Sequence, residues 1–248
     1  MRIGLLMNPT ISDFRKNTLR SIIADPAFTV VMALIDDRPQ ASAWNRLKKN
    51  LRRGRGGYVV VMALRRLFAP AIPQENSEDY CDRHDIAVYR TTSPYAEEAL
   101  TTVVNSKLDV LVLVGGFGIV RKKMIEATPL GVLSYHHGDM RRYRGMPPAM
   151  WELYNGETEM GITVQLITPG LDNGRPIVEE VIGIERRDDV DRLTGRALKV
   201  SEPMLHAALR RLADPEFVAP EIVEFGDVYT LPNLRQWLTL QYRIWKKK

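Results

Sequence analysis

The sequence contains little cysteine and no long apolar run. Cys81 is the single cysteine among 248 residues, which excludes an internal disulfide and a cysteine-based zinc site. No stretch approaches the roughly 20 consecutive apolar residues of a membrane-spanning helix, and the first apolar run stops at Asn8 and Pro9. We therefore expect an intracellular, cytoplasmic protein without a signal peptide, a membrane span or a metal site.

Acidic residues are absent from one part of the chain. Residues 38–74 contain nine Arg or Lys and no Asp or Glu, and the remainder has 26 basic and 30 acidic residues, a net charge of −4. The overall charge of +5 therefore reflects a local patch. We expect the part from Arg46 to Arg66 either to contact an acidic partner or a membrane surface, or to be an ordinary solvated face. Nucleic-acid binding is not expected.

Length and composition indicate one folded core with an appendage. Hydrophobic residues make up 45% of the chain and charged residues 26%, without low-complexity tracts, so bulk disorder is excluded. We predict a main domain over residues 1–213 and a C-terminal extension over residues 214–248. The oligomeric state is left open, with a homodimer as one alternative.

Apolar and amphipathic segments alternate through the first 135 residues. This alternation predicts a doubly wound α/β fold with a mostly parallel sheet, because right-handed crossovers place helices on both faces. Residues 54–73 fit either a strand or a helix, and we predict a helix. The expected strands are 2–7, 28–35, 86–89, 110–114 and 131–135, and the expected helices are 13–24, 42–51, 54–73, 76–83, 93–106 and 119–127.

The pattern changes after residue 146. We expect two strands joined by a turn at 170–174, then one long helix, and a tail with two short strands and a last helix containing tryptophan. The expected ranges are a helix at 148–153, strands at 161–168 and 176–184, a helix at 189–213, and strands at 223–225 and 228–230.

Ligands of doubly wound sheets bind beyond the carboxyl ends of the strands, so the residues that follow strands are the candidates for function. The first such turn, from Met7 to Thr10, has no Gly-x-Gly-x-x-Gly, which disfavours a dinucleotide. The turn Gly115-Gly116-Phe117-Gly118 could make a bend or lie against a flat ligand.

Two adjacent histidines follow the strand expected at 131–135. Neighbouring residues of a strand point to opposite faces, so His136 and His137 cannot both face one crevice. One of them is a candidate catalyst, although an isolated histidine is more often a structural residue. Leu171-Asp172-Asn173-Gly174, taken alone, is an ordinary turn.

Together these segments resemble the core of the folate-dependent formyltransferase family, which includes glycinamide ribonucleotide, methionyl-tRNA and nucleotide-sugar formyltransferases. The family pattern is Asn-x-His, a Ser-Leu-Leu-Pro loop, Arg-Gly, Gly-x-Thr-Val and Leu-Asp-x-Gly. His136, Arg144-Gly145, Gly161 to Val164 and Asp172 match it, and the resemblance extends over about residues 109–180.

The resemblance implies a Rossmann-like fold and 10-formyltetrahydrofolate as the formyl donor. His136 would stabilise the oxyanion that forms when an amine attacks the formyl carbon, and Asp172 would hold the histidine charged. The implied sites are catalytic His136, Asp172 and Ser134; folate-binding Gly116, Phe117, Gly118, Ile119, Val120, Thr168 and Leu171; and substrate-binding His137, Asp139, Arg142 and Arg144.

Two positions depart from the family pattern. Ser134 replaces the asparagine that assists the histidine, and Gly138-Asp139-Met140-Arg141 replaces Ser-Leu-Leu-Pro. Loss of one oxyanion donor typically lowers the rate by about 10²–10³. Either Ser134 acts through a water, or His137 or Asp139 takes over, or the activity is altered. We favour the rebuilt site with His137 or Asp139, in which Ser134→Asn would lower the rate of transfer.

The expected acceptor is a small amine: a sugar nucleotide, an amino acid or a natural-product precursor. The glycine-rich phosphate loop of the glycinamide ribonucleotide enzymes is missing after the first strand. The alternatives are a formyltransferase-like binding or scaffold protein with lost catalysis, and a hydrolase of formyltetrahydrofolate.

Overall fold

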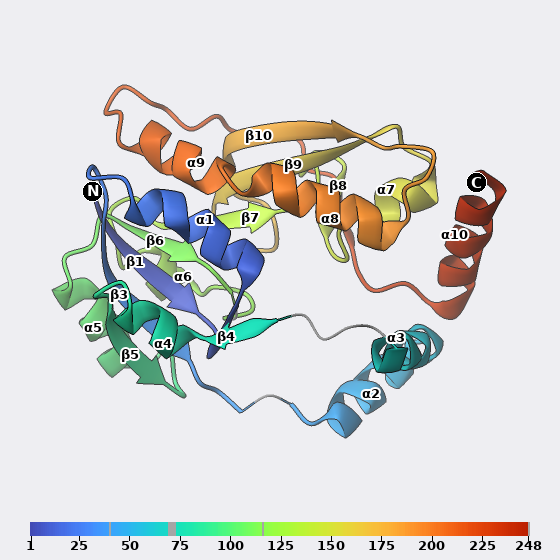
Figure 1. The fold of residues 1–248 in the computed structure, drawn as a ribbon, viewed down its shortest axis with the longest axis horizontal. Coiled ribbons are helices and arrows are strands. Elements are labelled where there is room, and N and C mark those ends of the chain that lie inside the picture. Colours follow the sequence, from blue (N-terminus) through green and yellow to red (C-terminus); the bar gives the residue numbers. More distant parts are fainter. Residues whose placement is uncertain (40, 69–72, 116, 248) are drawn as a thin grey trace.

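The computed structural model describes residues 1–39, 41–68, 73–115 and 117–247, and its centre is a seven-stranded sheet (Figure 1). The strand order is β10-β9-β7-β6-β1-β3-β5, and β9 alone runs against the other strands. The predicted mostly parallel, Rossmann-like α/β fold is confirmed. The strands are β1 (Arg2–Met7), β3 (Thr29–Asp36), β5 (Ala87–Thr91), β6 (Val110–Leu113), β7 (Val132–His136), β9 (Glu159–Leu166) and β10 (Arg175–Gly183).

Helices cover both faces of this sheet. Alternate residues of β1 enter two separate cores: Ile3, Leu5 and Met7 pack on one face and Leu6 on the other. The first face carries α1 (Asp13–Ile23), α4 (Ser77–Asp82), α8 (Val190–Ser201) and α9 (Met204–Leu212), and the second carries α5 (Glu97–Asn105) and α6 (Lys122–Ile125).

Two helix predictions were wrong. The long helix expected at 189–213 is two helices, α8 and α9, separated at Glu202 and Pro203, because proline lacks the N–H that a continuous helix needs. The helix expected from residue 93 begins only at Glu97, after a turn in which the main-chain N–H of Ala96 donates to the oxygen of Ser93.

Three shorter segments also differ from expectation. The helix expected at 119–127 spans only α6, residues 223–225 form no strand, and the polar turn after β1 contains β2 (Thr10–Ser12), which pairs with β4 (Gln74–Asn76). The helix expected at 54–73 is confirmed as α3 (Gly56–Phe68), with residues 69–72 outside the described part.

The tail and the basic segment meet at one end of the molecule. Figure 1 shows α2 (Ala43–Arg52), α3 and α10 (Leu234–Lys247) beside each other and away from most of the sheet. The tail also supplies β11 (Asp227–Tyr229), which pairs in parallel with β8 (Tyr143–Gly145), and α10 contacts α7 (Met150–Asn155). Among the described residues, no helix is both long and apolar enough to cross a bilayer.

Candidate active site

His136 ends β7 at the carboxyl edge of the parallel strands, and its ring is buried. Its Nε2 lies 2.7 Å from the main-chain oxygen of Tyr143, and its Nδ1 lies 3.5 Å from Oδ2 of Asp172. A carbonyl oxygen only accepts hydrogen bonds, so Nε2 carries a proton, and a proton on Nδ1 would face a carboxylate. The ring is therefore held between a main-chain carbonyl and a carboxylate.

Asp172 is held toward His136 by the turn between β9 and β10. Its Oδ2 accepts a hydrogen bond from the main-chain N–H of Gly145 at 2.9 Å, and its Oδ1 accepts one from Nε2 of Gln165 at 3.3 Å. Its φ of +45° lies in the left-handed region, which a residue with a side chain rarely adopts. Hydrogen bonds from β8 and β9 thus fix the carboxylate.

The C-terminal extension lies directly against this pair. Tyr229 of β11 is opposite Gly145, whose φ is +90°, and a Cβ on Gly145 would clash with the main-chain oxygen of Tyr229. The cavity beside His136, lined also by Tyr143 and Trp151, has a volume of only about 10 Å³. The histidine is therefore enclosed on this side.

Ser134 lies two residues before His136 and so on the same face of β7. Its hydroxyl donates to the main-chain oxygen of Tyr135 at 3.3 Å rather than toward His136 or Asp172. Its neighbour across the strand pair is Gln165 of β9. The structure places Ser134 beside the pair without connecting its hydroxyl to it.

His137 lies on the opposite face, as strand alternation predicts. Its ring stacks on Tyr135 with a centroid distance of 5.6 Å and contacts the edge of Phe14. Its Nε2 lies 3.1 Å from Oγ of Ser201. Burial lowers the pKa of His137 to about 3, with the nearby Arg15 adding to the shift. The structure does not bring this side chain to His136.

The loop after β7 uses its charged side chains in local contacts. Oδ1 of Asp139 accepts from the main-chain N–H of Arg141 at 2.9 Å, and Arg142 pairs with Glu157 at 2.6 Å. Asp139 and Arg142 share a hollow of about 310 Å³. Arg144 donates from Nε to the main-chain oxygen of Gly226 at 2.7 Å, so it anchors the extension.

The residues expected to bind folate lie on two loops at the carboxyl edge. Gly116 is outside the described residues. Phe117 and Gly118 line an open hollow of about 460 Å³ that is also bordered by Asn8 and Arg38 and does not reach His136. Arg38 contributes to its wall by donating from Nη2 to the main-chain oxygen of Phe117 at 3.3 Å.

The other expected folate residues differ in exposure. Ile119 is 63% exposed and Leu171 is 41% exposed, whereas Val120 is buried in the second core. Thr168 donates from Oγ1 to the main-chain oxygen of Asn173 at 2.9 Å and so stabilises the turn of Asp172. Two large apolar side chains therefore remain free on loops of this edge.

Sequence reasoning missed two buried polar residues of this region. Gln165 holds the Asp172 turn on both sides, because its Oε1 accepts from the main-chain N–H of Gly174 at 3.0 Å while its Nε2 donates to Asp172. Burial raises the pKa of Glu152 on α7 to about 7, with a smaller contribution from Glu157. A glutamine within the apolar run GITVQLI was the available signal for the first residue; Glu152 had none.

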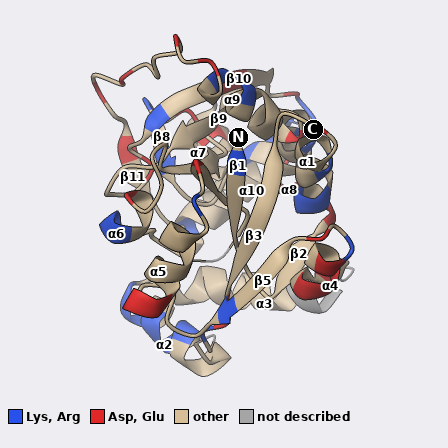
Figure 2. Cartoon of the chain, turned by 90° about the vertical axis from the view of Figure 1, so that its left-hand side faces the viewer, with Lys and Arg blue, Asp and Glu red and all other residues tan. Residues whose placement is uncertain are grey.

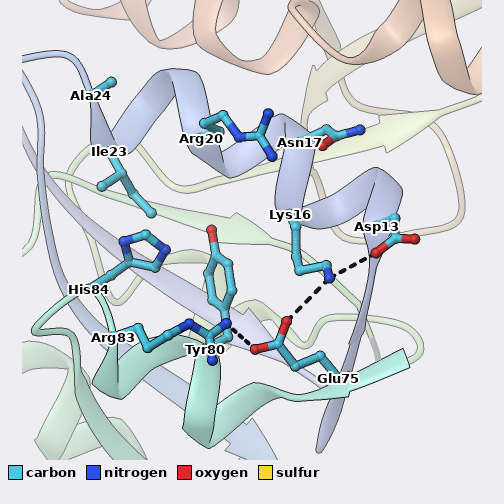
Figure 3. Close-up of a pocket in the computed structure, with 10 residues that line it drawn as sticks. All are labelled: Asp13, Lys16, Asn17, Arg20, Ile23, Ala24, Glu75, Tyr80, Arg83 and His84. Carbon is cyan, nitrogen blue, oxygen red and sulfur yellow. Dashed lines mark hydrogen bonds and ion pairs between the residues drawn. The ribbon is translucent and has the colours of Figure 1, made fainter. Parts of the chain in front are cut away.

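A larger hollow of about 750 Å³ lies elsewhere, between α1 and α4, and contains none of the predicted site residues (Figure 3). Lys16 lies 2.8 Å from Asp13 and 3.2 Å from Glu75, which also pairs with Arg83. The charged groups that line this hollow largely neutralise one another. The size of the hollow alone therefore does not make it the active site.

Comparison with known proteins identifies relatives over this region. Residues 58–209 match the family model described as formyl transferase. The methionyl-tRNA formyltransferase of Trichlorobacter lovleyi is 29% identical over 154 residues, which cover 62% of this chain and 48% of that protein. The chain thus spans about half the length of the curated relatives that it matches.

Solved structures share the fold at lower identity. Glycinamide ribonucleotide transformylase 1 from Symbiobacterium toebii superposes with a TM-score of 0.62 at 19% identity, covering 92% of this chain and 94% of that one. A formyltetrahydrofolate deformylase from Pseudomonas syringae superposes with a TM-score of 0.63 at 18% identity, and the match covers 91% of this chain and 66% of the deformylase. The structure of the N-formyltransferase from Helicobacter canadensis contains folinic acid and dTDP-3-aminofucose. It superposes with a TM-score of 0.61 at 15% identity, and the match covers 98% of this chain and 80% of that one.

Proposed function

The chain belongs to the formyl transferase family, and we propose that it transfers a formyl group from 10-formyltetrahydrofolate to the amine of a small acceptor. The observation that carries this proposal is the buried His136 with its two nitrogens facing Tyr143 and Asp172. A buried imidazole oriented by a carboxylate can donate from Nε2 to an oxyanion, which is what formyl transfer to an amine requires.

The residues divide the chemistry between them. The folate supplies an activated formyl carbon to which the acceptor nitrogen forms a bond as the bond to the folate nitrogen breaks. His136 stabilises the negative charge on the formyl oxygen by redirecting its Nε2–H from the carbonyl of Tyr143. Asp172 orients the ring from its Nδ1 side and accepts the proton that the amine loses, which then passes to the folate nitrogen. Gln165 acts as a positioning residue for Asp172.

The carboxyl edge suits a flat and partly apolar group. Ile119 and Leu171 leave apolar side chains exposed there, and the open hollow next to Phe117 and Gly118 offers main chain for contact. We propose these residues as the folate site, with Val120 supporting it from the core and Thr168 from the turn of Asp172; Gly116, also expected there, lies outside the described residues. The folinic acid in the Helicobacter canadensis structure supports this class of ligand.

The acceptor is proposed as a small amine, of which an aminosugar nucleotide is one example, because a structural neighbour holds such a compound. Asp139 and Arg142 are the candidates for contact with it, since both line a hollow close to Tyr143. The deformylase neighbour favours a second candidate, in which water replaces the amine.

Release of tetrahydrofolate from 10-formyltetrahydrofolate, measured with and without a panel of amines, tests the proposal. We expect release that depends on an amine and falls at least a hundredfold in His136→Ala. His84→Ala, which removes an exposed histidine outside the site, is the matched control. Release that needs no amine would indicate the hydrolase, and wild-type rates in His136→Ala would refute the catalytic assignment.

A further inference from the structure

Two basic segments far apart in the sequence form one unit at the end of the molecule. Residues 43–68 and 231–248 together contain 13 Lys or Arg and no Asp or Glu. Tyr58 of α3 packs against Trp237 of α10 with ring centroids 5.3 Å apart, and Arg55 donates to Oγ1 of Thr230 at 2.7 Å. The charge that looks like one local patch in the sequence is thus extended by the C-terminal helix. We call α2, α3 and α10 the basic unit.

The basic side chains of α2 and of Arg53, which directly follows it, have no acidic partner in the part of the chain that the structure describes. Within the described ranges, no carboxylate forms an ion pair with Arg46, Lys48, Lys49, Arg52 or Arg53, whereas arginines of the sheet body pair with acids, as Arg38 does with Asp36. Figure 2 shows Lys and Arg along α2 and acidic residues on α4. The cations of α2 remain available for an external anion.

Large apolar side chains lie among these cations. In α10, Trp237, Leu240 and Ile244 are buried, while Leu238, Tyr242 and Trp245 are 57%, 60% and 72% exposed on another side of the same helix. In α2 no residue is buried, and Trp44 is 68% exposed. Exposed tryptophan and leucine combined with basic residues are typical of helices that lie in a bilayer interface.

We propose that the basic unit docks on an anionic phospholipid surface, with Trp44 and Trp245 inserting among the headgroups and the lysines and arginines contacting lipid phosphates. A nucleic acid would satisfy the charges but would leave the exposed leucine and valine side chains without apolar contact, and lipid accommodates both. Leu51 of α2 and Val60 and Leu64 of α3 are further exposed apolar side chains of the basic unit.

Sedimentation of the full chain with vesicles tests this docking. We expect binding to phosphatidylcholine vesicles containing 30% phosphatidylglycerol, little binding to pure phosphatidylcholine, and weakening by salt. Lys48→Glu, Lys49→Glu and Arg52→Glu together should lower partitioning at least about a hundredfold, because each lost cation accounts for roughly fivefold and each added carboxylate repels the anionic lipid. The matched control reverses the exposed Lys122, Lys123 and Lys199 outside the unit and should retain binding.

Tryptophan fluorescence reports insertion separately from charge. Of the four tryptophans, Trp151 and Trp237 are buried and Trp44 and Trp245 are exposed. Brominated lipids in anionic vesicles should therefore quench the wild type and not a Trp44→Ser, Trp245→Ser variant, with Val104→Ser, Val181→Ser as the control for loss of exposed apolar surface. Circular dichroism verifies that each variant is folded.

Three outcomes would overturn the proposal. The first is equal partitioning of the wild type and the charge-reversed variant. The second is tight binding to transfer RNA that prevents vesicle binding and is unaffected by loss of the two tryptophans. The third is a dimer in solution that dissociates in the tryptophan variant and does not bind vesicles. None of these readouts depends on formyl transfer.

Discussion

At the scale of single residues, His136 and Asp172 form one functional unit rather than two independent groups. The carboxylate lies 3.5 Å from Nδ1, and the opposite nitrogen faces a carbonyl. Without Asp172 the ring of His136 loses the carboxylate that orients it, and without His136, Asp172 has no ring to orient. We therefore expect Asp172→Asn and His136→Ala each to remove most turnover, and the double variant to lose little more. Rate losses that multiply would show that the two residues act separately.

The position of Ser134 reverses one expectation drawn from the sequence. His137 bonds to Ser201 on the opposite face and Asp139 accepts from its own loop, and both contacts argue against a replacement of the family asparagine by these residues. The side chain of Ser134 ends one bond earlier than an asparagine amide. We now expect Ser134→Asn to raise the rate of transfer at least tenfold, because it restores a donor worth about 10²–10³. A lower rate would support a rebuilt site.

Glu152 should make stability depend on pH. Burial raises the pKa of its carboxyl from 4.5 to about 7. Between these two pH values the folded protein holds a proton that the unfolded chain has lost. Stability from this group is present at low pH and is lost as the pH rises from about 4.5 through 7. Glu152→Gln should therefore raise the free energy of unfolding at pH 8 by about 2–3 kcal/mol, measured by urea denaturation.

The same comparison at pH 4.5 should show almost no difference between Glu152→Gln and the wild type. Glu180→Gln, at an exposed position, serves as the control. His137 acts in the opposite direction, because its pKa is lowered to about 3 and it loses stability as the pH falls below about 6.5. An unchanged free energy of unfolding at pH 8 for Glu152→Gln would contradict the raised pKa of this buried carboxyl.

At the scale of elements, the pairing of β8 with β11 attaches the C-terminal extension to the candidate site. Gly145 permits it, because its φ is +90° and the main chain of Tyr229 occupies the space of a Cβ. Gly145→Ala should destabilise the protein by about 2–4 kcal/mol and lower the Tm by roughly 5–10 °C in a calorimetric scan.

Gly195→Ala is the matched control for this substitution. Gly195 is in α8, where a Cβ meets no atom within 4 Å, so alanine should stabilise the helix by up to about 1 kcal/mol. Equal Tm values for Gly145→Ala and the wild type would show that β11 leaves β8 easily.

At the scale of the whole molecule, ligand binding should appear as added stability. Folinic acid is a stable relative of the proposed formyl donor. At about 100 times its Kd it should stabilise the folded state by about 2.7 kcal/mol, which raises the Tm by roughly 5–10 °C. No shift in thermal denaturation at millimolar folinic acid would refute the cofactor class, and it would leave the proposed lipid surface untouched.

The sequence alone determined the alternation of strands and helices, the strand ends on which the candidate residues lie, and the separation of His136 from His137. These properties depend on local periodicity and on the two-residue repeat of a strand, which neighbouring residues encode. Helix ends were predicted less well, since the start of α5 and the division between α8 and α9 depend on turn geometry and on one proline.

Only the tertiary structure decided which distant segments meet. The pairing of β11 with β8 and the joining of α10 to the basic segment connect residues that are far apart in the sequence, and the burial of Glu152 has no local sequence signal. Contacts of this kind arise from packing of the complete chain, because burial and main-chain pairing are satisfied between elements rather than within them.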